Sequence, residues 1–165
     1  MEIEPIYREH SAVLFRYVVR MTGDAELAAD VVQDTFIKLS EMPPRSPDPR
    51  NWLYRVATNL VRERRRTAVR RLRLAHGGTE RLPHGDAPVP PDVLLERQEA
   101  RDAVRAALAA LPERDRAALL MRADGMAYDE IAKAIGATPG SVGTILVRAM
   151  RKLTRELPME GEGHR

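Results

Sequence analysis

The chain has 165 residues, with 27 lysines and arginines against 24 acidic residues, a formal net charge of +3 and a sequence pI of about 9.6. It has no cysteine, which excludes disulfides, thiolate zinc sites and cysteine catalysis. No apolar run approaches a membrane span and the N-terminal stretch lacks a signal-peptide core, so we expect a cytoplasmic protein without membrane insertion. Scarce aromatic residues and abundant alanine, leucine, arginine and glutamate predict an all-α fold.

Two amphipathic helices are predicted before the first proline-rich loop. The first should end near Gly23, and Asp24 can cap the second, over residues 25–42. The first 49 residues carry nine acids against five bases, so DNA is not expected to meet this part first. In the second helix we expect Leu27, Val31, Thr35 and Leu39 on the inner side, and Asp30, Gln33, Asp34 and Lys38 outside. The outer face is either a solvated acidic surface or a protein-binding one. No further metal ligand lies nearby, so a metal site is not expected.

A third helix with a basic tail is predicted after the loop at residues 42–50. Asp48 can cap it, and Pro49 fits the first helical position. Its inner side is expected to hold Trp52, Leu53, Val56, Ala57 and Leu60. Its tail then carries seven arginines against Glu63 alone, and these are Arg62, Arg64, Arg65, Arg66, Arg70, Arg71 and Arg73. Together with Thr58 and Asn59 one turn earlier, this tail favours binding of a nucleic-acid strand over a merely solvated surface.

Residues 76–92 are rich in glycine and proline and indicate a flexible linker between two small helical domains. After it we expect one helix lined by Val104, Leu108 and Leu111, and another that opens near Pro112 and ends at Asp124-Gly125. The last eight residues are typical of a frayed tail.

The segment from Tyr128 to Leu153 predicts a helix-turn-helix. Tyr128, Ile131, Ala132 and Ile135 share one face of a short helix, and Gly136 can take the left-handed turn that ends it. Thr138 can cap the second helix with Pro139 at its first position, and Val142, Ile145, Leu146, Ala149 and Leu153 should be buried. The outward face carries hydroxyl, apolar and guanidinium groups suited to a DNA major groove, with Gly140, Gly143, Thr144, Val147, Arg148 and Arg151 on it and Lys152 and Arg155 beside it.

Three segments in this order resemble a bacterial RNA polymerase sigma factor of the extracytoplasmic-function (ECF) group, which keeps only regions 2 and 4. Residues 30–39 (DVVQDTFIKL) resemble its polymerase-binding signature, and residues 51–66 (NWLYRVATNLVRERRR) its promoter-melting helix. Residues 111–153 resemble its region 4. The resemblance implies region 2 at residues 1–75, a linker at 76–93, region 4 at 94–157 and a tail at 158–165.

The resemblance also implies partners and roles. Core RNA polymerase would be contacted through its β′ clamp and β flap, with Asp30, Val32, Gln33, Asp34 and Phe36 on the clamp. A flipped base of the −10 element would be captured by the loop at residues 43–50 and by Asn59. The −10 and melting contacts would come from Arg50, Asn59, Arg62, Arg64, Arg65 and Arg66. The −35 contacts would come from Thr138, Ser141, Gly143, Thr144, Val147, Arg148, Arg151 and Lys152.

Such a protein binds promoter DNA, cuts no bond, needs no cofactor and is often restrained by an anti-sigma protein on another chain. Two positions depart from the family pattern. Ala127 stands where serine or threonine is common as a helix cap, and Gly143 where arginine or lysine is common.

Two other classes of function remain as alternatives. A dimeric DNA-binding regulator of the LuxR type would share the helix-turn-helix, but the N-terminal half resembles neither a ligand-binding nor a phosphoacceptor domain. For an enzyme, the nucleotide-binding glycine loop, the H-E-x-x-H zinc motif and the G-x-S-x-G nucleophile motif are all missing from the sequence. A role for Arg148 in bracing the bundle or gripping a phosphate also stays open.

Overall fold

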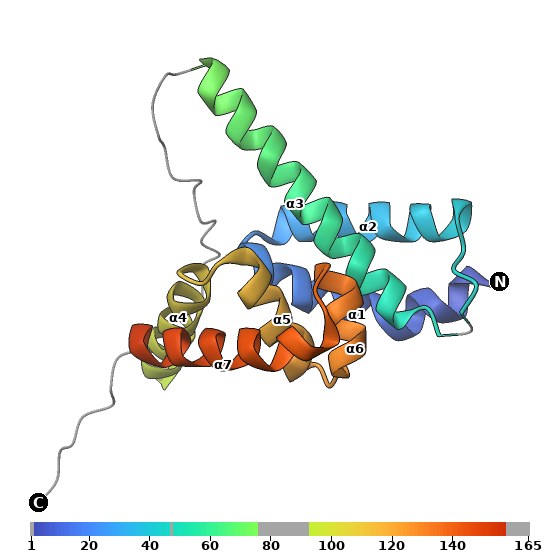
Figure 1. Ribbon diagram of the computed structural model, residues 1–165. Coiled ribbons are helices and arrows are strands. Elements are labelled where there is room, and N and C mark those ends of the chain that lie inside the picture. Colours follow the sequence, from blue (N-terminus) through green and yellow to red (C-terminus); the bar gives the residue numbers. More distant parts are fainter. Residues whose placement is uncertain (1, 47, 76–92, 158–165) are drawn as a thin grey trace, which may run out of the picture.

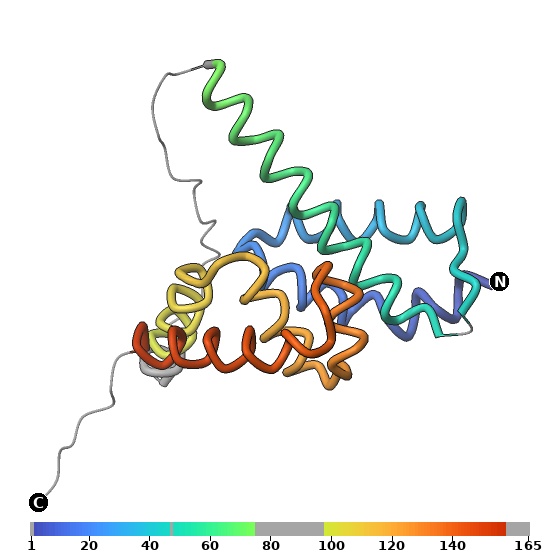
Figure 2. Tube along the Cα trace, viewed as in Figure 1, coloured from blue at the N-terminus to red at the C-terminus, as the bar shows by residue number. Residues whose placement is uncertain are grey.

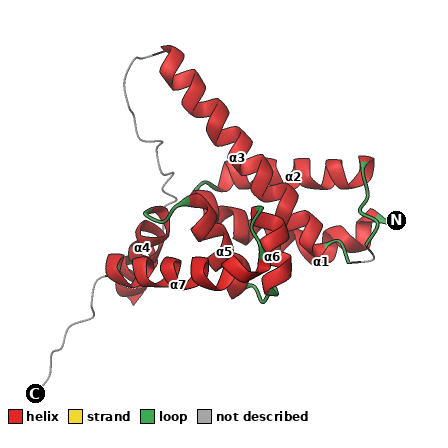
Figure 3. Cartoon of the chain, in the orientation of Figure 1, coloured by secondary structure: helices red, strands yellow, loops and turns green. Residues whose placement is uncertain are grey.

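The computed structural model describes residues 2–46, 48–75 and 93–157, and these residues form helices and loops without a strand (Figures 1 and 3). The all-α prediction is confirmed. The predicted linker at 76–92 and the tail at 158–165 lie outside the described residues. The helices are α1 (Ile3–Thr22), α2 (Ala25–Glu41), α3 (Arg50–Ala75), α4 (Val93–Ala109), α5 (Glu113–Ala123), α6 (Tyr128–Ile135) and α7 (Pro139–Glu156).

Short-range signals set the helix boundaries in the first half of the chain (α1–α3, residues 2–75) close to the predicted positions. Gly23 ends α1 with a φ of 74°, and its N–H donates to the Val19 carbonyl at 2.7 Å. The Asp24 carboxylate then accepts from the Leu27 N–H at 2.9 Å and caps α2. The Asp48 carboxylate accepts from the Arg50 N–H at 2.9 Å, where α3 begins, one residue after the predicted start at Pro49. The chain therefore makes two sharp, capped transitions that fold α1, α2 and α3 against one another.

The core of the first half holds the apolar residues that the helical spacing predicts. Leu14, Tyr17, Val18 and Met21 of α1 are buried against Val31 of α2 and its neighbours. In α3, Leu53, Ala57 and Leu60 are buried, whereas Trp52 and Val56 are only partly so. The C-terminal end of α3 projects away from the body of the molecule (Figure 1).

The second half of the chain (α4–α7, residues 93–157) contains the predicted helix-turn-helix, formed by α6 and α7. Gly136 separates them in the left-handed conformation with a φ of 70°, and Pro139 occupies the first turn of α7. Val142, Ile145, Leu146 and Ala149 are buried and Leu153 is partly buried, as expected. Thr138 precedes α7, but its hydroxyl makes no cap hydrogen bond. Tyr128 and Val104, expected to face inward, are 46% and 43% exposed, whereas Ala132 and Ala107 on the same helices are buried.

An alanine at the N-cap of α6 leaves one capping interaction unmade. Glu130 already accepts from the Ala127 N–H at 2.7 Å, but Ala127 has no side-chain oxygen to return a bond to the first turn. Its backbone is extended, with φ −74° and ψ 159°, as an N-cap requires. We therefore expect Ala127→Ser to raise the free energy of unfolding by about 1 kcal/mol. Urea denaturation measures the change, and Ala127→Val is the control, because valine has no hydroxyl and is as poor an N-cap as alanine.

The two halves of the chain pack directly on each other. Helix α6 lies along α3, and α4 and α5 lie against α1, so segments far apart in sequence are neighbours (Figure 2). Polar groups are buried at this contact and just beneath it. The Tyr54 hydroxyl donates to Asp124 at 2.9 Å, and the hydroxyls of Tyr17 and Thr58 share a hydrogen bond at 2.8 Å. No described helix is long and apolar enough to span a membrane.

Candidate polymerase and nucleic-acid interfaces

An apolar groove runs between α1 and α2 and contains part of the residue set predicted to bind polymerase. Val32 and Phe36 are each only 6% exposed and form its floor. Gln33 is exposed at its edge. The predicted acidic residues Asp30 and Asp34 do not line this groove. The face of α2 that borders the groove is therefore more apolar than the sequence analysis predicted.

The other wall of this groove comes from α1 and was missed by sequence reasoning. Ile3, Tyr7 and Phe15 line it together with Ile37 of α2. The Tyr7 ring meets the Phe36 ring edge-on, with centroids 4.9 Å apart, yet Tyr7 is still 50% exposed. Ile3, Tyr7, Ser11 and Phe15 recur at a four-residue spacing, and this second stripe on the helix was the available signal.

Asp30 and Asp34 contact the basic helix instead. The Arg64 guanidinium lies 2.5 Å from Asp34 and 3.5 Å from Asp30. This pairing joins a residue predicted to bind DNA with two predicted to bind polymerase. Arg64 thus joins the acidic face of α2 to the basic part of α3.

The other predicted −10 residues divide into engaged and open groups. Arg50 donates to the Asp124 carbonyl, Arg62 donates to Glu113 at 3.0 Å, and Arg65 donates to Glu113 at 3.3 Å. By contrast, Asn59 and Arg66 are exposed. Thr58, which the sequence analysis placed near the strand-binding tail, is completely buried, and its hydroxyl shares a hydrogen bond with the Tyr17 hydroxyl.

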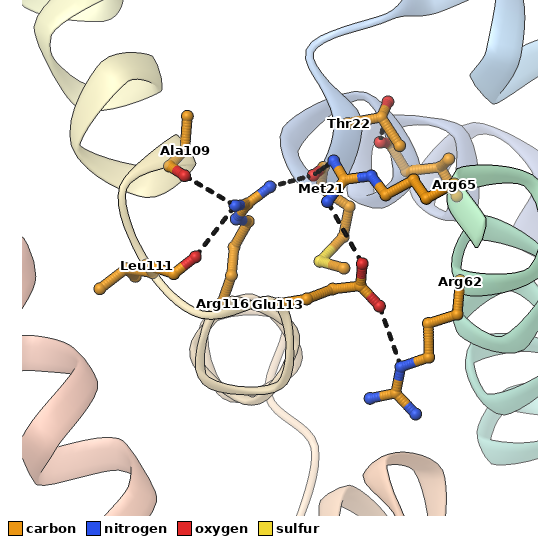
Figure 4. Close-up of polar contacts among 9 residues, drawn as sticks. Met21, Thr22, Arg62, Arg65, Ala109, Leu111, Glu113 and Arg116 are labelled. Atoms are coloured by element: carbon orange, nitrogen blue, oxygen red, sulfur yellow. Dashed lines mark hydrogen bonds and ion pairs between the residues drawn. The ribbon is translucent and has the colours of Figure 1, made fainter. Parts of the chain in front are cut away.

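The contacts of Arg62 and Arg65 belong to a polar cluster between the halves (Figure 4). The Met21 carbonyl, at the end of α1, accepts from Arg65 at 2.9 Å and from Arg116 at 2.6 Å. Arg116 also donates to the carbonyls of Ala109 and Leu111, at 2.9 and 3.0 Å. Burial, aided by the neighbouring Arg65, lowers the pKa of Arg116 to about 10. It stays charged near neutral pH, which the carbonyl oxygens around it make possible.

A basic groove adjoins the cluster, between the projecting part of α3 and the second half. It is lined by Arg62, Arg65, Arg66, Arg70 and Arg73 from α3 and by Arg114 from α5. Arg66, Arg70 and Arg73 are exposed, so their guanidinium groups can reach phosphate.

The outward face of α7 presents most of the predicted −35 residues to solvent. Thr138, Thr144, Val147 and Arg151 are exposed, whereas Gly143 and Lys152 are half-buried. The Ser141 hydroxyl donates to the Thr138 carbonyl at 2.8 Å. An added Cβ at Gly143 would meet the Tyr128 ring at 3.7 Å, an ordinary contact, so nothing in the packing requires glycine there.

Arg148 forms an ion pair within its own half. Its Nε and Nη2 donate to the two oxygens of Asp115 at 2.8 and 2.6 Å, and the Asp115 side chain is only 2% exposed. This bidentate pair holds α7 on α5 and neutralises a buried carboxylate. The pair raises the pKa of Arg148, because the Asp115 carboxylate stabilises its charged form.

We expect Arg148→Lys to lower the melting temperature of the chain, because an ammonium cannot make the parallel pair of bonds to Asp115. Differential scanning calorimetry tests this. The control is Arg151→Lys, one turn along the same helix at an exposed position. Equal melting temperatures for the two variants would show that the bidentate geometry contributes nothing to stability.

Comparison with known proteins agrees with this arrangement. The family model described as "Sigma-70 region 2" matches residues 6–71, and "Sigma-70, region 4" matches residues 101–153. The ECF RNA polymerase sigma factor SigL of Mycobacterium tuberculosis is 36% identical over 163 residues, with 92% of this chain and 88% of the relative covered. The RNA polymerase sigma factor YlaC of Bacillus subtilis is 28% identical, with 99% and 96% covered.

Two solved structures share the fold. The sigma factor RpoE of Bartonella quintana, in complex with the anti-sigma factor NepR, has a TM-score of 0.75 at 20% identity, with 96% of this chain and 98% of that chain covered. The PhyRSL–NepR complex of Sphingomonas sp. Fr1 gives 0.64 at 22% identity, with 100% and 98% covered. The order of the helices, the two family-model matches and the identity to SigL all indicate the same family. The chain belongs to the sigma-70 family, within its ECF RNA polymerase sigma factors.

Proposed function

We propose that this protein binds core RNA polymerase and directs it to promoters by recognising −35 and −10 elements and helping to melt the DNA. The observation that carries the proposal is the succession, in one chain, of an apolar docking groove, an arginine-lined helix and an exposed helix-turn-helix face. In this proposal residues 1–75 act as region 2 and residues 94–157 as region 4. The protein supplies binding energy and carries out no catalytic step.

The α1/α2 groove is the proposed site for the polymerase clamp. Helix-in-groove recognition needs an apolar floor with exposed edges, and Val32, Phe36, Tyr7 and Ile37 provide both. Gln33 adds a hydrogen-bonding group at the edge. Asp30 and Asp34 act in this proposal mainly by positioning Arg64.

The exposed arginines of α3 are the proposed grip on DNA near the −10 element. Arg66, Arg70 and Arg73 can contact phosphates without regard to sequence. Asn59 is exposed and is the proposed partner of an unstacked base. Unstacking a base costs a few kcal/mol, which contacts of this kind can offset.

The exposed face of α7 is the proposed reader of the −35 element. Thr144, Val147 and Arg151 are accessible and lie on one side of the helix, which suits a major groove. Because Arg148 is engaged with Asp115, we propose that it holds α7 in position and does not read a base. Direct readout then depends on few side chains, and DNA shape contributes the remainder.

Run-off transcription with core polymerase tests the proposal. Core polymerase that carries no sigma factor is mixed with the chain and with templates bearing candidate ECF promoters. We expect a discrete transcript only when the chain is present and both promoter elements are intact. Transcripts that do not depend on the chain would refute the proposal.

The alternative function, a dimeric DNA-binding regulator, differs from the proposed one in how the protein should bind DNA without polymerase. We expect the chain to bind duplex promoter DNA weakly and with little sequence preference, because neither half has the effective concentration that polymerase would impose. Electrophoretic mobility shifts at several salt concentrations measure this. A tight dimeric complex with a palindromic site would instead favour the regulator.

A further inference from the structure

A cavity of about 840 Å³ lies where the end of α1 meets α3, α4 and α5. Cavities of roughly 300–1,000 Å³ are typical of small-molecule sites. The cavity shares only Arg65 with the basic groove described above, so it is a separate feature of the surface. Its charged lining consists of Arg20, Arg64, Arg65, Arg105 and Arg116, with Asp24 as the one carboxylate. We call it the arginine cavity.

The lining stays electropositive although most of its arginines form ion pairs. The carboxylates paired with them are Asp30, Asp34, Asp102, Glu113 and Asp124, and none of these lines the cavity. Each of these ion pairs engages one or two nitrogens of a guanidinium group that has five N–H donors. Guanidinium donors therefore face the cavity more closely than the carboxylates that balance them, which favours an anionic ligand.

Arg116 adds a buried charge that the protein compensates only in part. Its guanidinium donates to three backbone carbonyls, among them that of Met21, and its Nε has no acceptor among the described residues. Arg65 donates to the same Met21 carbonyl (Figure 4). Burial and the nearby Arg65 lower the pKa of Arg116, because both disfavour its charged form. An anion in the cavity would stabilise that charged form.

The remaining wall of the cavity is apolar and built from small side chains. It consists of Ala68 on α3 and of Ala106, Ala109 and Ala110 at the end of α4, with Met21 and Leu27 beside them. The three alanines at the end of α4 are exposed. A flat ring can pack against such a surface, while guanidinium groups match phosphate oxygens with paired donors. The cavity thus offers both kinds of contact that a nucleotide needs.

We propose that the arginine cavity binds a nucleoside di- or triphosphate, with its phosphates on the arginines and its base on the alanine wall. This inference goes beyond the proposed function, which concerns polymerase and promoter DNA, and it does not depend on it. Free polyphosphate shares the phosphate chemistry but lacks the base, so the two sources can be separated by experiment.

Isothermal titration calorimetry of the full chain with four probes makes that separation. The probes are GTP, ATP, tripolyphosphate and orthophosphate. We expect each nucleotide to bind at one molar equivalent, tripolyphosphate to bind roughly tenfold more weakly because it buries no base, and orthophosphate to bind more weakly still. No binding of either nucleotide at about 1 mM would overturn the proposal. Tripolyphosphate that binds as tightly as GTP would overturn the assignment to a nucleotide.

A first pair of variants tests whether the cavity is the place of binding. Arg105 is 48% exposed and its ion pair is with Asp102 on its own helix, so Arg105→Gln leaves the packing of the helices intact. The control is Arg101→Gln, one turn earlier, which changes the net charge equally at an exposed position that does not line the cavity. We expect Arg105→Gln to bind GTP roughly fivefold more weakly than Arg101→Gln. Equal affinities would place the nucleotide elsewhere and contradict the proposal.

A second pair puts a carboxylate into the cavity. Ala106→Glu places a negative charge among the arginines, whereas Ala100→Glu places one on an exposed part of α4 outside the lining. Both variants should keep the helical circular dichroism of the unchanged chain. We expect GTP to raise the melting temperature of the unchanged chain and of Ala100→Glu, but not of Ala106→Glu, because only a bound ligand stabilises the folded state. An equal rise for the two variants would show that the cavity is not the nucleotide site.

Discussion

Replacing Gln33 and Ile37 with alanine is expected to weaken the affinity for core polymerase by roughly 30-fold, the effect typical of truncating side chains at the centre of an interface. Both residues line the α1/α2 groove, and Ile37 is 47% exposed in the chain without a partner. The alanine variants keep the floor formed by Val32 and Phe36. Titration of a labelled chain with core polymerase, followed by fluorescence anisotropy, measures the change.

The matched control for this experiment lies on the same helix. Glu26 and Lys38 are exposed on α2 but do not line the groove. Their double alanine variant should bind polymerase as tightly as the unchanged chain, and both variants should keep the same helical circular dichroism. If the groove variant and the control bind equally well, the groove is not the polymerase site.

The second large effect concerns promoter choice. We expect Thr144→Ala with Arg151→Ala to reorder transcription among −35 variants, by about 1–3 kcal/mol for each base that the helix no longer reads, or roughly fivefold to 150-fold. Both side chains are exposed, and they lie seven residues apart on one face of α7. A panel of promoters that differ only in the −35 element, transcribed with saturating variant protein, gives the ranking.

The comparison for promoter choice is Arg66→Ala with Arg70→Ala on α3. These exposed arginines are proposed to hold phosphate, so their removal should lower transcription from every promoter alike and flatten its dependence on salt. Arg148→Ala should also act uniformly, because it loosens the packing of α7 on α5. An unchanged ranking in the Thr144 and Arg151 variant would refute sequence reading by this face.

Local signals made the helix boundaries predictable. Gly23 and Gly136 have positive φ and end their helices, Asp24 caps α2, and Pro139 opens α7. Each of these effects depends on residues within four positions of one another. The all-α fold and the helix-turn-helix followed from the same kind of information together with the apolar periodicity.

Partners that are distant in sequence were not predictable in the same way. Asp115 lies in the charged run ERDR (residues 113–116), which is typical of a solvated surface, yet it is buried and paired with Arg148 of α7, 33 residues away. Arg62 and Glu113 are 51 residues apart. The packing of α7 on α5 creates the first pair and the packing of the two halves creates the second, and neither charge nor spacing along the chain encodes these contacts.

The candidate site was consequently predicted better for its elements than for its individual side chains. The sequence placed the basic tail on α3 and the outward face on α7. It could not distinguish Arg66, which is exposed, from Arg65, which contacts Glu113 and the Met21 carbonyl. Adjacent arginines point to different sides of a helix, and which side meets the second half depends on tertiary structure.

Permanganate footprinting of a promoter tests the central claim most directly, because it detects unpaired thymines without requiring a transcript. Core polymerase, the chain and a supercoiled promoter template are combined and compared with mixtures that omit one protein. We expect reactive thymines around the −10 element and the start site only when both proteins are present, and none when the −35 element is scrambled. Reactivity that is absent with both proteins, or equal with core polymerase alone, would contradict the assignment of this protein to promoter recognition and melting.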